Sequence, residues 1–299
     1  MTADMPIKAL APWFGGKGNL AALIVRELGR HRSYWEPFCG SMAVLLAKPA
    51  AYMETVNDLH RDLINLARVI RDPIASPALY RRLRRIFHSE MDYRQAIAAQ
   101  TAPALAEDTP DLDRAQTYFI TSWMGRKGLS GTPMKNTGSF GVRYTALGGT
   151  GGVRWLSAVR SIPAWRRRLA RVTILSRDGL ELLGRIEDAD GTAIYCDPPY
   201  LVKGTSYLHD FDADHHAALA AAVARFRRAR VVVSYYDHPA LADLYPPARW
   251  SRVTVTVNKA MALGGRRGVN QTTADEVLLL NGPSHAQPDN PTPPGGLFQ

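Results

Sequence analysis

The 299 residues suffice for one large α/β domain, or for one domain that carries an insertion. The apolar share of 46% supports a sizeable core, but no apolar run reaches the ~20 residues that span a bilayer, and two cysteines exclude a disulfide framework. The formal charge of +10 favours a polyanion as partner, and because the first residues lack a signal-peptide pattern, we expect a cytoplasmic protein.

The first seventy residues alternate between helices and short strands. Helices are predicted over 21–28, 42–47 and 59–70 from apolar residues at helical spacing, and strands over 33–36 and 52–56. Strand, loop and helix in this repeated order open a doubly wound α/β fold with a largely parallel sheet.

Between residues 74 and 165 this alternation stops. Helices and then a glycine-rich loop are predicted there: 79–87, 94–100, 115–124 and the loop from Gly125 to Gly152. Strands return afterwards, at 171–175, 193–196, 231–234, 252–257 and 276–280. We therefore predict a core domain with a mainly helical insertion and a proline-rich, disordered tail, divided as 1–73 with 166–281, 74–165, and 282–299.

The strand at 193–196 runs directly into Asp197-Pro198-Pro199-Tyr200. A carboxylate, and a carbonyl that the proline rings hold in place, can each accept a hydrogen bond from one N–H of an aromatic amine. These hydrogen bonds localise the nitrogen lone pair for attack. A tyrosine ring beside them can stack on the base that carries the amine. The alternative is a strand that merely ends in a proline turn.

Two further motifs follow predicted strands. Glu36-Pro-Phe-Cys-Gly40-Ser41 joins the first strand to a helix, and a glycine there lets a ligand approach the backbone. Asp58, at the end of the second strand, is placed to bind ribose hydroxyls, to cap the following helix, or to do both. The incomplete glycine pattern disfavours a nicotinamide oxidoreductase.

The segment Pro12-Trp-Phe-Gly-Gly-Lys17 suits a loop that brings an aromatic ring and a cation to a ligand. It is not a phosphate-binding Walker loop, because no Ser or Thr follows the lysine. The alternative is a turn with a solvated lysine.

These motifs, in this order, resemble those of the Dam-type class of DNA adenine-N6 methyltransferases. The resemblance rests on Phe14-Gly-Gly-Lys17, Glu36 to Ser41, Asn57-Asp58 before Asp62-Leu-Ile-Asn65, and Asp197 to Tyr200, and it extends over roughly residues 10–280. It implies a Rossmann-like methyltransferase domain that uses S-adenosylmethionine and acts on an adenine flipped out of double-stranded DNA. It also implies an enzyme that needs no metal, and we expect a monomer in a bacterial or phage-infected cell.

The resemblance assigns roles residue by residue. The cofactor-binding set is Trp13, Gly15, Lys17, Glu36, Phe38, Gly40, Asp58, Asp178 and Asp197. Within it Lys17 is expected near the cofactor carboxylate, Asp58 at the ribose, and Asp178 at the adenine or equally as a helix cap. The catalytic set is Asp197, Pro198, Pro199 and Tyr200, and the residues expected to contact DNA are Arg126, Lys127, Lys135 and Arg143.

The sequence departs from the family pattern in places. Met42 stands where the family has a small residue, and Gly125-Arg-Lys-Gly-Leu129 replaces the usual recognition pattern, so the target sequence stays open. The basic loop 260–273 also has no clear match. The alternatives are a catalytically silent DNA-binding protein on the same fold and an amine methyltransferase acting on cytosine or RNA. Asp197 disfavours the cytosine enzyme, which more often carries Ser at this position.

Overall fold

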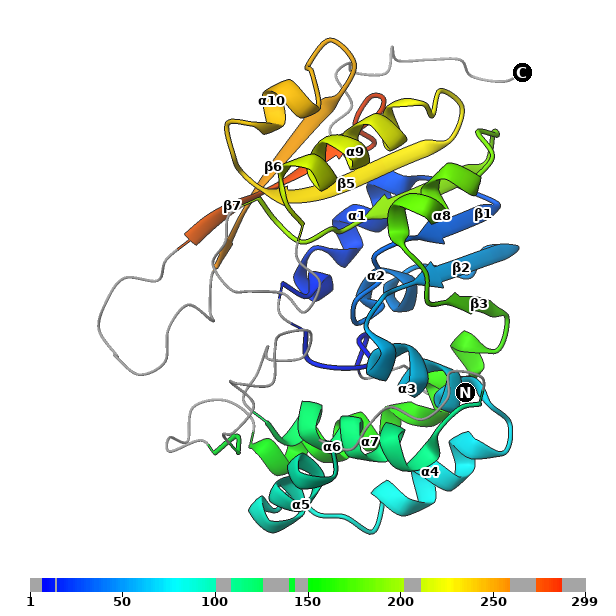
Figure 1. The fold of residues 1–299 in the computed structure, drawn as a ribbon, viewed down its shortest axis with the longest axis vertical. Coiled ribbons are helices and arrows are strands. Elements are labelled where there is room, and N and C mark those ends of the chain that lie inside the picture. Colours follow the sequence, from blue (N-terminus) through cyan, green and yellow to red (C-terminus); the bar gives the residue numbers. More distant parts are fainter. Residues whose placement is uncertain are drawn as a thin grey trace, which may run out of the picture.

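The computed structural model describes residues 7–13, 15–100, 109–125, 140–142, 150–201, 211–258 and 273–286. A seven-stranded sheet occupies its upper part in Figure 1, with a group of helices below. The sheet order is β3-β2-β1-β4-β5-β7-β6. The strands are β1 (Ser33–Glu36), β2 (Met53–Asn57), β3 (Val172–Leu175), β4 (Thr192–Cys196), β5 (Arg230–Tyr236), β6 (Ser251–Asn258) and β7 (Thr273–Leu280). Each lies where a strand was predicted, which confirms the doubly wound fold.

The order of the strands reverses between β1 and β4, which pair in parallel with Trp35 opposite Ile194. This is the point at which open α/β sheets bind ligands, outside the carboxyl ends of the strands. β1 ends at Glu36 and β4 at Cys196, so the glycine-containing turn and the Asp197 tetrapeptide leave the sheet side by side.

The strand side chains alternate between two hydrophobic cores, one on each face of the sheet. On β4, Ala193 and Tyr195 belong to one core, and Ile194 and Cys196 to the other. The first core receives α1 (Ala21–Leu28) and α2 (Ala43–Ala47); the second receives α8 (Gly179–Arg185), α9 (Ala213–Ala224) and α10 (Leu241–Leu244). A short 3-10 helix, η1 (Lys17–Asn19), precedes α1.

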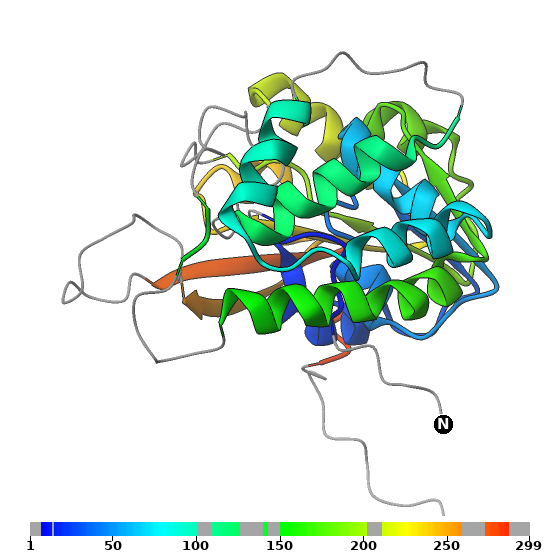
Figure 2. The same cartoon turned by 90° about the horizontal axis from the view of Figure 1, so that it is seen from below.

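Figure 2 views the molecule from below, with the lower group of helices in front of the sheet, and α3 packs against β3. Its members are α3 (Arg61–Arg71), α4 (Ala75–Leu83), α5 (Glu90–Gln100), α6 (Leu112–Met124) and α7 (Gly151–Leu169). The rings of Phe119, Trp155 and Trp165 are buried at its centre. Among the described residues, no helix is long and apolar enough to cross a membrane.

The helical group also holds the N-terminal segment against the sheet domain. Trp165 Nε1 donates to the Ile7 carbonyl at 2.7 Å, and Trp123 Nε1 donates to the Leu10 carbonyl at 3.1 Å. On its other side, the Leu10 N–H donates to the Ser41 carbonyl at 3.0 Å. The loop that carries Trp13 and Lys17 therefore starts from a segment fixed to both parts of the molecule.

Several helices differ from the sequence prediction: α9 and α10 were not predicted, α5 begins at Glu90 and not at residue 94, and α4 and α7 differ for reasons that the structure shows. α4 begins at Ala75, because Asp72 Oδ1 accepts from the Ile74 and Ala75 amides, and it ends before the predicted limit of 87. α7 was not predicted, since it opens on two glycines and contains Pro163. Its burial of two tryptophans outweighs these weak helix formers. The predicted domain limit at 165 falls inside α7, and the division into domains stays a prediction.

Residues 282–286, placed in the disordered tail by composition, are anchored by a buried carboxylate. Glu27 Oε1 accepts from Ser284 Oγ at 2.7 Å and from the Ala286 amide at 3.0 Å, and Glu27 Oε2 accepts from the His285 amide at 2.9 Å. Arg230 lies 3.2 Å from the same carboxylate. Proline content alone gives no sign of this anchor, and residues 287–299 lie outside the described part.

Glu27→Ala should lower the free energy of unfolding by about 3 kcal/mol, because Arg230 and residues 284–286 all lose a buried partner. It should also remove the protection of the His285 and Ala286 amides from hydrogen exchange. The control is Glu181→Ala, which removes only an exposed ion pair with Arg185 and should change stability little. Equal losses in the two variants would contradict the anchor.

Candidate active site

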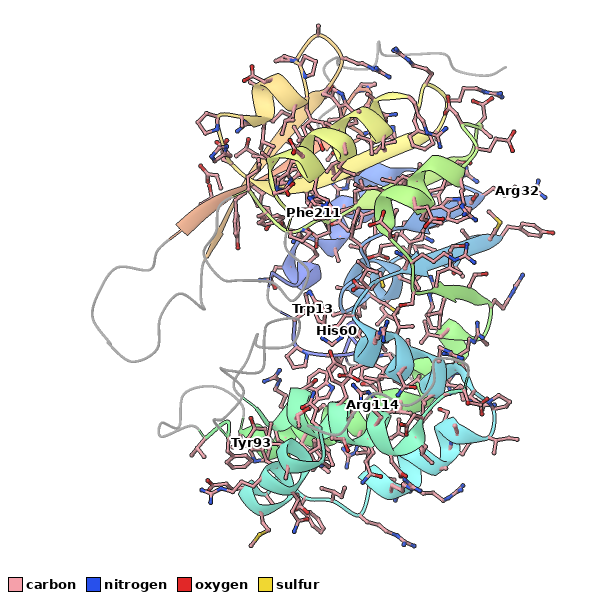
Figure 3. The ribbon with its side chains drawn as sticks, viewed as in Figure 1. Trp13, Arg32, His60, Tyr93, Arg114 and Phe211 are labelled. Carbon is pink, nitrogen blue, oxygen red and sulfur yellow. The ribbon has the colours of Figure 1, made fainter. Side chains whose placement is uncertain are left out.

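A cavity opens at the strand ends where β1 and β4 meet, and the empty space inside it, together with its open mouth, is about 780 Å³. The sequence-predicted residues on its wall are Trp13, Gly15, Lys17, Phe38, Gly40, Asp58, Asp178, Asp197, Pro198, Pro199 and Tyr200. In Figure 3, Trp13 and His60 lie where the sheet meets the helical group, and Phe211 lies nearer α9. Arg32, just before β1, lies at the opposite end of the strands, where β1 begins.

Asp58 fixes the glycine turn. Its Oδ2 accepts from the Gly40 amide at 2.8 Å, and its Oδ1 accepts from the His60 amide at 2.8 Å. The cap of α3 is His60, whose Nδ1 accepts from the Leu63 amide at 3.2 Å. Asp58 therefore does not cap that helix, although it lines the cavity where the ribose role was predicted.

Asn57 joins the ends of three neighbouring strands, a role that the sequence did not reveal. Its Nδ2 donates to the Pro37 carbonyl after β1 and to the Arg177 carbonyl after β3, both at 2.9 Å. Its Oδ1 accepts from the Arg177 amide at 2.8 Å. The next residue, Asp178, lines the cavity and also caps α8 by accepting from the Glu181 amide at 2.8 Å. The structure therefore shows the helix cap, and the contact of Asp178 with the cofactor adenine stays a prediction.

Aromatic rings form two sides of the cavity. Trp13 meets His60 edge to face with ring centroids 5.3 Å apart, and Phe38 meets Phe211 in the same manner at 5.6 Å. His60 and Phe211 were not predicted, because neither belongs to a recognisable motif. Such rings suit a flat, apolar group such as a nucleobase.

Gly40 has the left-handed φ of +42°, and a Cβ there would meet Trp13 Nε1 at 2.9 Å. The turn and the aromatic wall therefore depend on glycine at this position. Met42, two residues on, has φ of +59° although it is fully buried and not a glycine. The sequence departure noted there thus coincides with a strained backbone.

Asp197 follows β4 and makes two contacts through one carboxylate oxygen. Its Oδ1 accepts from Ser234 Oγ at 2.9 Å and lies 2.9 Å from Lys17 Nζ. Ser234 also hydrogen-bonds Tyr195 OH at 2.9 Å. Burial raises the pKa of the Asp197 carboxyl above its usual value, and the Lys17 ammonium opposes that rise.

Lys17 is buried beside Asp197 and a second carboxylate, Glu276 of β7. The alternative of a solvated lysine is therefore wrong. Glu276 was not predicted, because Asp275-Glu276 precedes a continuous apolar run in which the inward positions cannot be told apart.

Glu36 does not line the cavity but lies buried beneath it. Tyr34 OH donates to Glu36 Oε2 at 2.9 Å. Burial raises the pKa of Glu36 to about 8, with Tyr34 opposing and Asp197 adding to the rise. At neutral pH this carboxyl is therefore largely protonated.

The remaining predicted residues lie outside the described part: Phe14, Arg126, Lys127, Lys135, Arg143 and the loop 260–272. Within the described part, no group of three or more metal-ligating side chains occurs.

The chain is similar to known DNA adenine methyltransferases. Residues 13–107, which include the first three motifs, match the family described as D12 class N6 adenine-specific DNA methyltransferase. A DNA adenine methylase of Vibrio cholerae is 25% identical over 283 residues, 91% of this chain and 95% of its own length. The chain is thus similar to this family over residues 13–107 and to a DNA adenine methylase over most of its length.

Two further adenine methyltransferases are similar to this chain. The retron Ec67 DNA adenine methylase of Escherichia coli is 26% identical over 285 residues, 92% of each chain. The DNA N-6-adenine-methyltransferase of Escherichia phage P1 is 27% identical over 252 residues, 80% of this chain and 31% of its own length.

Gly40→Ala should weaken binding of S-adenosylmethionine, the cofactor implied by the family, by about tenfold or more. The added methyl displaces the Trp13 ring, and the positive φ strains the turn that Asp58 holds. Isothermal calorimetry measures the affinity. The control is Gly184→Ala in α8, where a Cβ meets nothing within 4 Å, and binding should be unchanged. Equal affinities in the two variants would contradict the assigned wall.

Glu36→Gln should remove a pH dependence of stability. In the folded protein the pKa of Glu36 is raised from 4.5 to about 8, so the folded state keeps a proton that the unfolded state loses. Stability then falls as pH rises from about 4.5 to about 8, by an amount on the order of 4 kcal/mol.

The side-chain amide that replaces the Glu36 carboxyl cannot ionise, and its oxygen can still accept from Tyr34. Urea unfolding should therefore find the variant more stable than the wild type at pH 8.5 and nearly equal at pH 5. A constant difference between the two proteins across this range would refute the buried, neutral carboxyl.

Proposed function

We propose that this protein transfers a methyl group from S-adenosylmethionine to the exocyclic N6 amine of an adenine flipped out of duplex DNA. The match of residues 13–107 to an adenine-specific DNA methyltransferase family and the similarity to DNA adenine methylases support this activity. The observation that carries it is that Asp197 and Pro198 lie on the wall of the same cavity as Gly40 and Asp58. The amine-activating tetrapeptide thus shares one pocket with the turn expected to bind the methyl donor.

The residues present fit such a cofactor. Asp58, at the end of β2, offers carboxylate oxygens to ribose hydroxyls, as acidic residues do in related folds. The turn at Gly40 has no side chain, so a ligand can approach the backbone there. Phe38 and Phe211 offer ring surface for an adenine. When bound, S-adenosylmethionine supplies a methyl group on a positively charged sulfur, which is already activated for transfer.

The chain's own residues prepare the target amine. The Asp197 carboxylate accepts a hydrogen bond from one N–H of the amine, and the Pro198 carbonyl accepts a hydrogen bond from the other. These two hydrogen bonds concentrate the lone pair on the nitrogen. Asp197 is the stronger acceptor of the two, because it is charged and lies in a partly desolvated position. The Tyr200 ring, packed against Tyr236 with centroids 4.6 Å apart, offers a face on which the flipped base can stack.

The DNA partner agrees with the charge of +10. Rotating a base out of the duplex costs a few kcal/mol, which stacking and the two hydrogen bonds offset. We assign DNA recognition to the helical segment 74–165 and to Arg126, Lys127, Lys135 and Arg143 within it. We expect a monomer that acts in the cytoplasm, where bacterial and phage DNA is found.

Asp197→Asn should reduce methyl transfer to adenine by about 100-fold or more, because the amide is a weaker acceptor at the reacting nitrogen. Binding of S-adenosylmethionine should change little, since Asp58 and the Gly40 turn are intact. Transfer of a labelled methyl group to duplexes that contain adenine is the measurement. Transfer at the wild-type rate would refute the role of Asp197.

The same assay separates the competing functions. Cytosine-containing duplexes without adenine and adenine-containing RNA are tested beside the DNA substrate. Methylation of either in preference to adenine in DNA would reassign the substrate. Binding of cofactor and DNA with no transfer at all would make the chain a silent DNA-binding protein.

A further inference from the structure

The ammonium of Lys17 is fully engaged by the protein. Its three N–H bonds meet three acceptors: Asp197 Oδ1 at 2.9 Å, Glu276 Oε1 at 3.1 Å and the Gly15 carbonyl at 2.7 Å. The residue is 5% exposed. Burial disfavours the charge, but Asp197 and Glu276 outweigh it and keep the pKa of Lys17 above its usual value. Lys17 therefore pairs with the two carboxylates, and its place near the cofactor carboxylate stays a prediction.

Glu276 holds two residues of the site through one oxygen. Its Oε1 accepts from Tyr200 OH at 2.6 Å as well as pairing with Lys17. The Lys17 ammonium in turn lies 4.8 Å from the centre of the Tyr200 ring. The ring expected to stack on the base and the cation beside Asp197 are thus placed by the same carboxylate.

Glu276 also changes the charge balance at Asp197. One ammonium shared by two carboxylates leaves a net negative charge, which acts against ionisation of Asp197, whereas Lys17 and Ser234 favour it. Glu276 is buried and does not line the cavity, so it acts only through its neighbours. Its neighbour Asp275 points the other way, is exposed, and bonds Thr256 Oγ1 at 2.7 Å.

We propose that Glu276 is a positioning residue for methyl transfer: it fixes Lys17 and Tyr200 around Asp197, and its charge makes Asp197 a more basic acceptor for the adenine amine. This inference rests on the proposed function. Without Glu276, one Lys17 N–H bond and the Tyr200 hydroxyl lose their buried acceptor, and Lys17 keeps only Asp197 and the Gly15 carbonyl.

The first test is titration of Asp197, followed by NMR of the ¹³C-labelled carboxyl and assigned by comparison with Asp197→Asn. Glu276→Gln keeps an oxygen that can accept from Lys17 and Tyr200 but removes the charge, so the titration midpoint should fall by roughly one pH unit. Ser234→Ala removes a hydrogen bond to the carboxylate and should shift the midpoint upward. Asp275→Asn, which removes a charge on the outward face of β7, should leave it unchanged.

Each variant changes one side chain and leaves the other titratable groups around Asp197 as they are in the wild type. They are Lys17, Glu36, Tyr195, Cys196, Tyr200, Tyr235, Tyr236 and Glu276. The opposite shifts expected for Glu276→Gln and Ser234→Ala therefore separate the charge of Glu276 from a general loosening of the site. A midpoint that stays or rises in Glu276→Gln overturns the proposal.

The second test is the single-turnover rate of methyl transfer, which isolates the chemical step from product release. Glu276→Ala should lower this rate on the order of 100-fold, as a misplacement of about 1 Å at a reacting group does. Affinity for S-adenosylmethionine should change less than about threefold, since Glu276 is not on the cavity wall. In Glu276→Gln the acid limb of the rate profile should move to lower pH together with the Asp197 midpoint.

A wild-type rate in Glu276→Ala, or a loss confined to cofactor affinity, overturns the positioning role. If Glu276→Ala does not fold, Glu276→Gln decides through its titration and acid limb. A wild-type protein that transfers nothing to adenine refutes the proposed function instead, and the titration still tests the contact between Glu276, Lys17 and Asp197.

Discussion

The ion pairs of Lys17 with Asp197 and Glu276 join three parts of the chain that are far apart in sequence. An isolated charge in a protein interior costs several kcal/mol, so each of the three groups is stable there only with the others present. This constraint links local chemistry to topology. Glu276 belongs to β7, which lies between β5 and β6 in antiparallel orientation to both, so the site is complete only when the last strand has entered the sheet.

The cavity wall at the ends of β1, β2 and β3 depends on a second set of contacts, made by side chains that hydrogen-bond the backbone. Asn57 and Asp58 use their side chains to hold the backbone segments that leave β1 and β3. Backbone groups at strand ends lack ladder partners and must be satisfied in another way. Here one amide and one carboxylate satisfy them, and the same contacts shape the turn at Gly40 against Trp13.

Sequence alone was sufficient where local chemistry decides the structure. Apolar strands such as Val231-Val-Val233 and motifs such as Asp197 to Tyr200 were placed correctly, because strand preference and turn residues are local properties. It was insufficient where partners are distant. α7 forms despite its glycines and Pro163 because its tryptophans are buried by other helices, and Glu276 and Glu27 have roles that only their three-dimensional neighbours define.

Leu10 has a consequence for how the two parts of the molecule respond to ligands. Its N–H is held by Ser41 beside the glycine turn, and its carbonyl by Trp123 of α6. Three residues later the chain reaches Trp13, whose indole packs against Gly40. The helical group and the cavity wall at Gly40 thus share one short peptide segment, so a displacement of either one should shift the other. Binding of a ligand in the cavity and binding of a partner to the helical group would then be thermodynamically linked. Whatever stabilises one bound state would favour the other by the same factor in both directions.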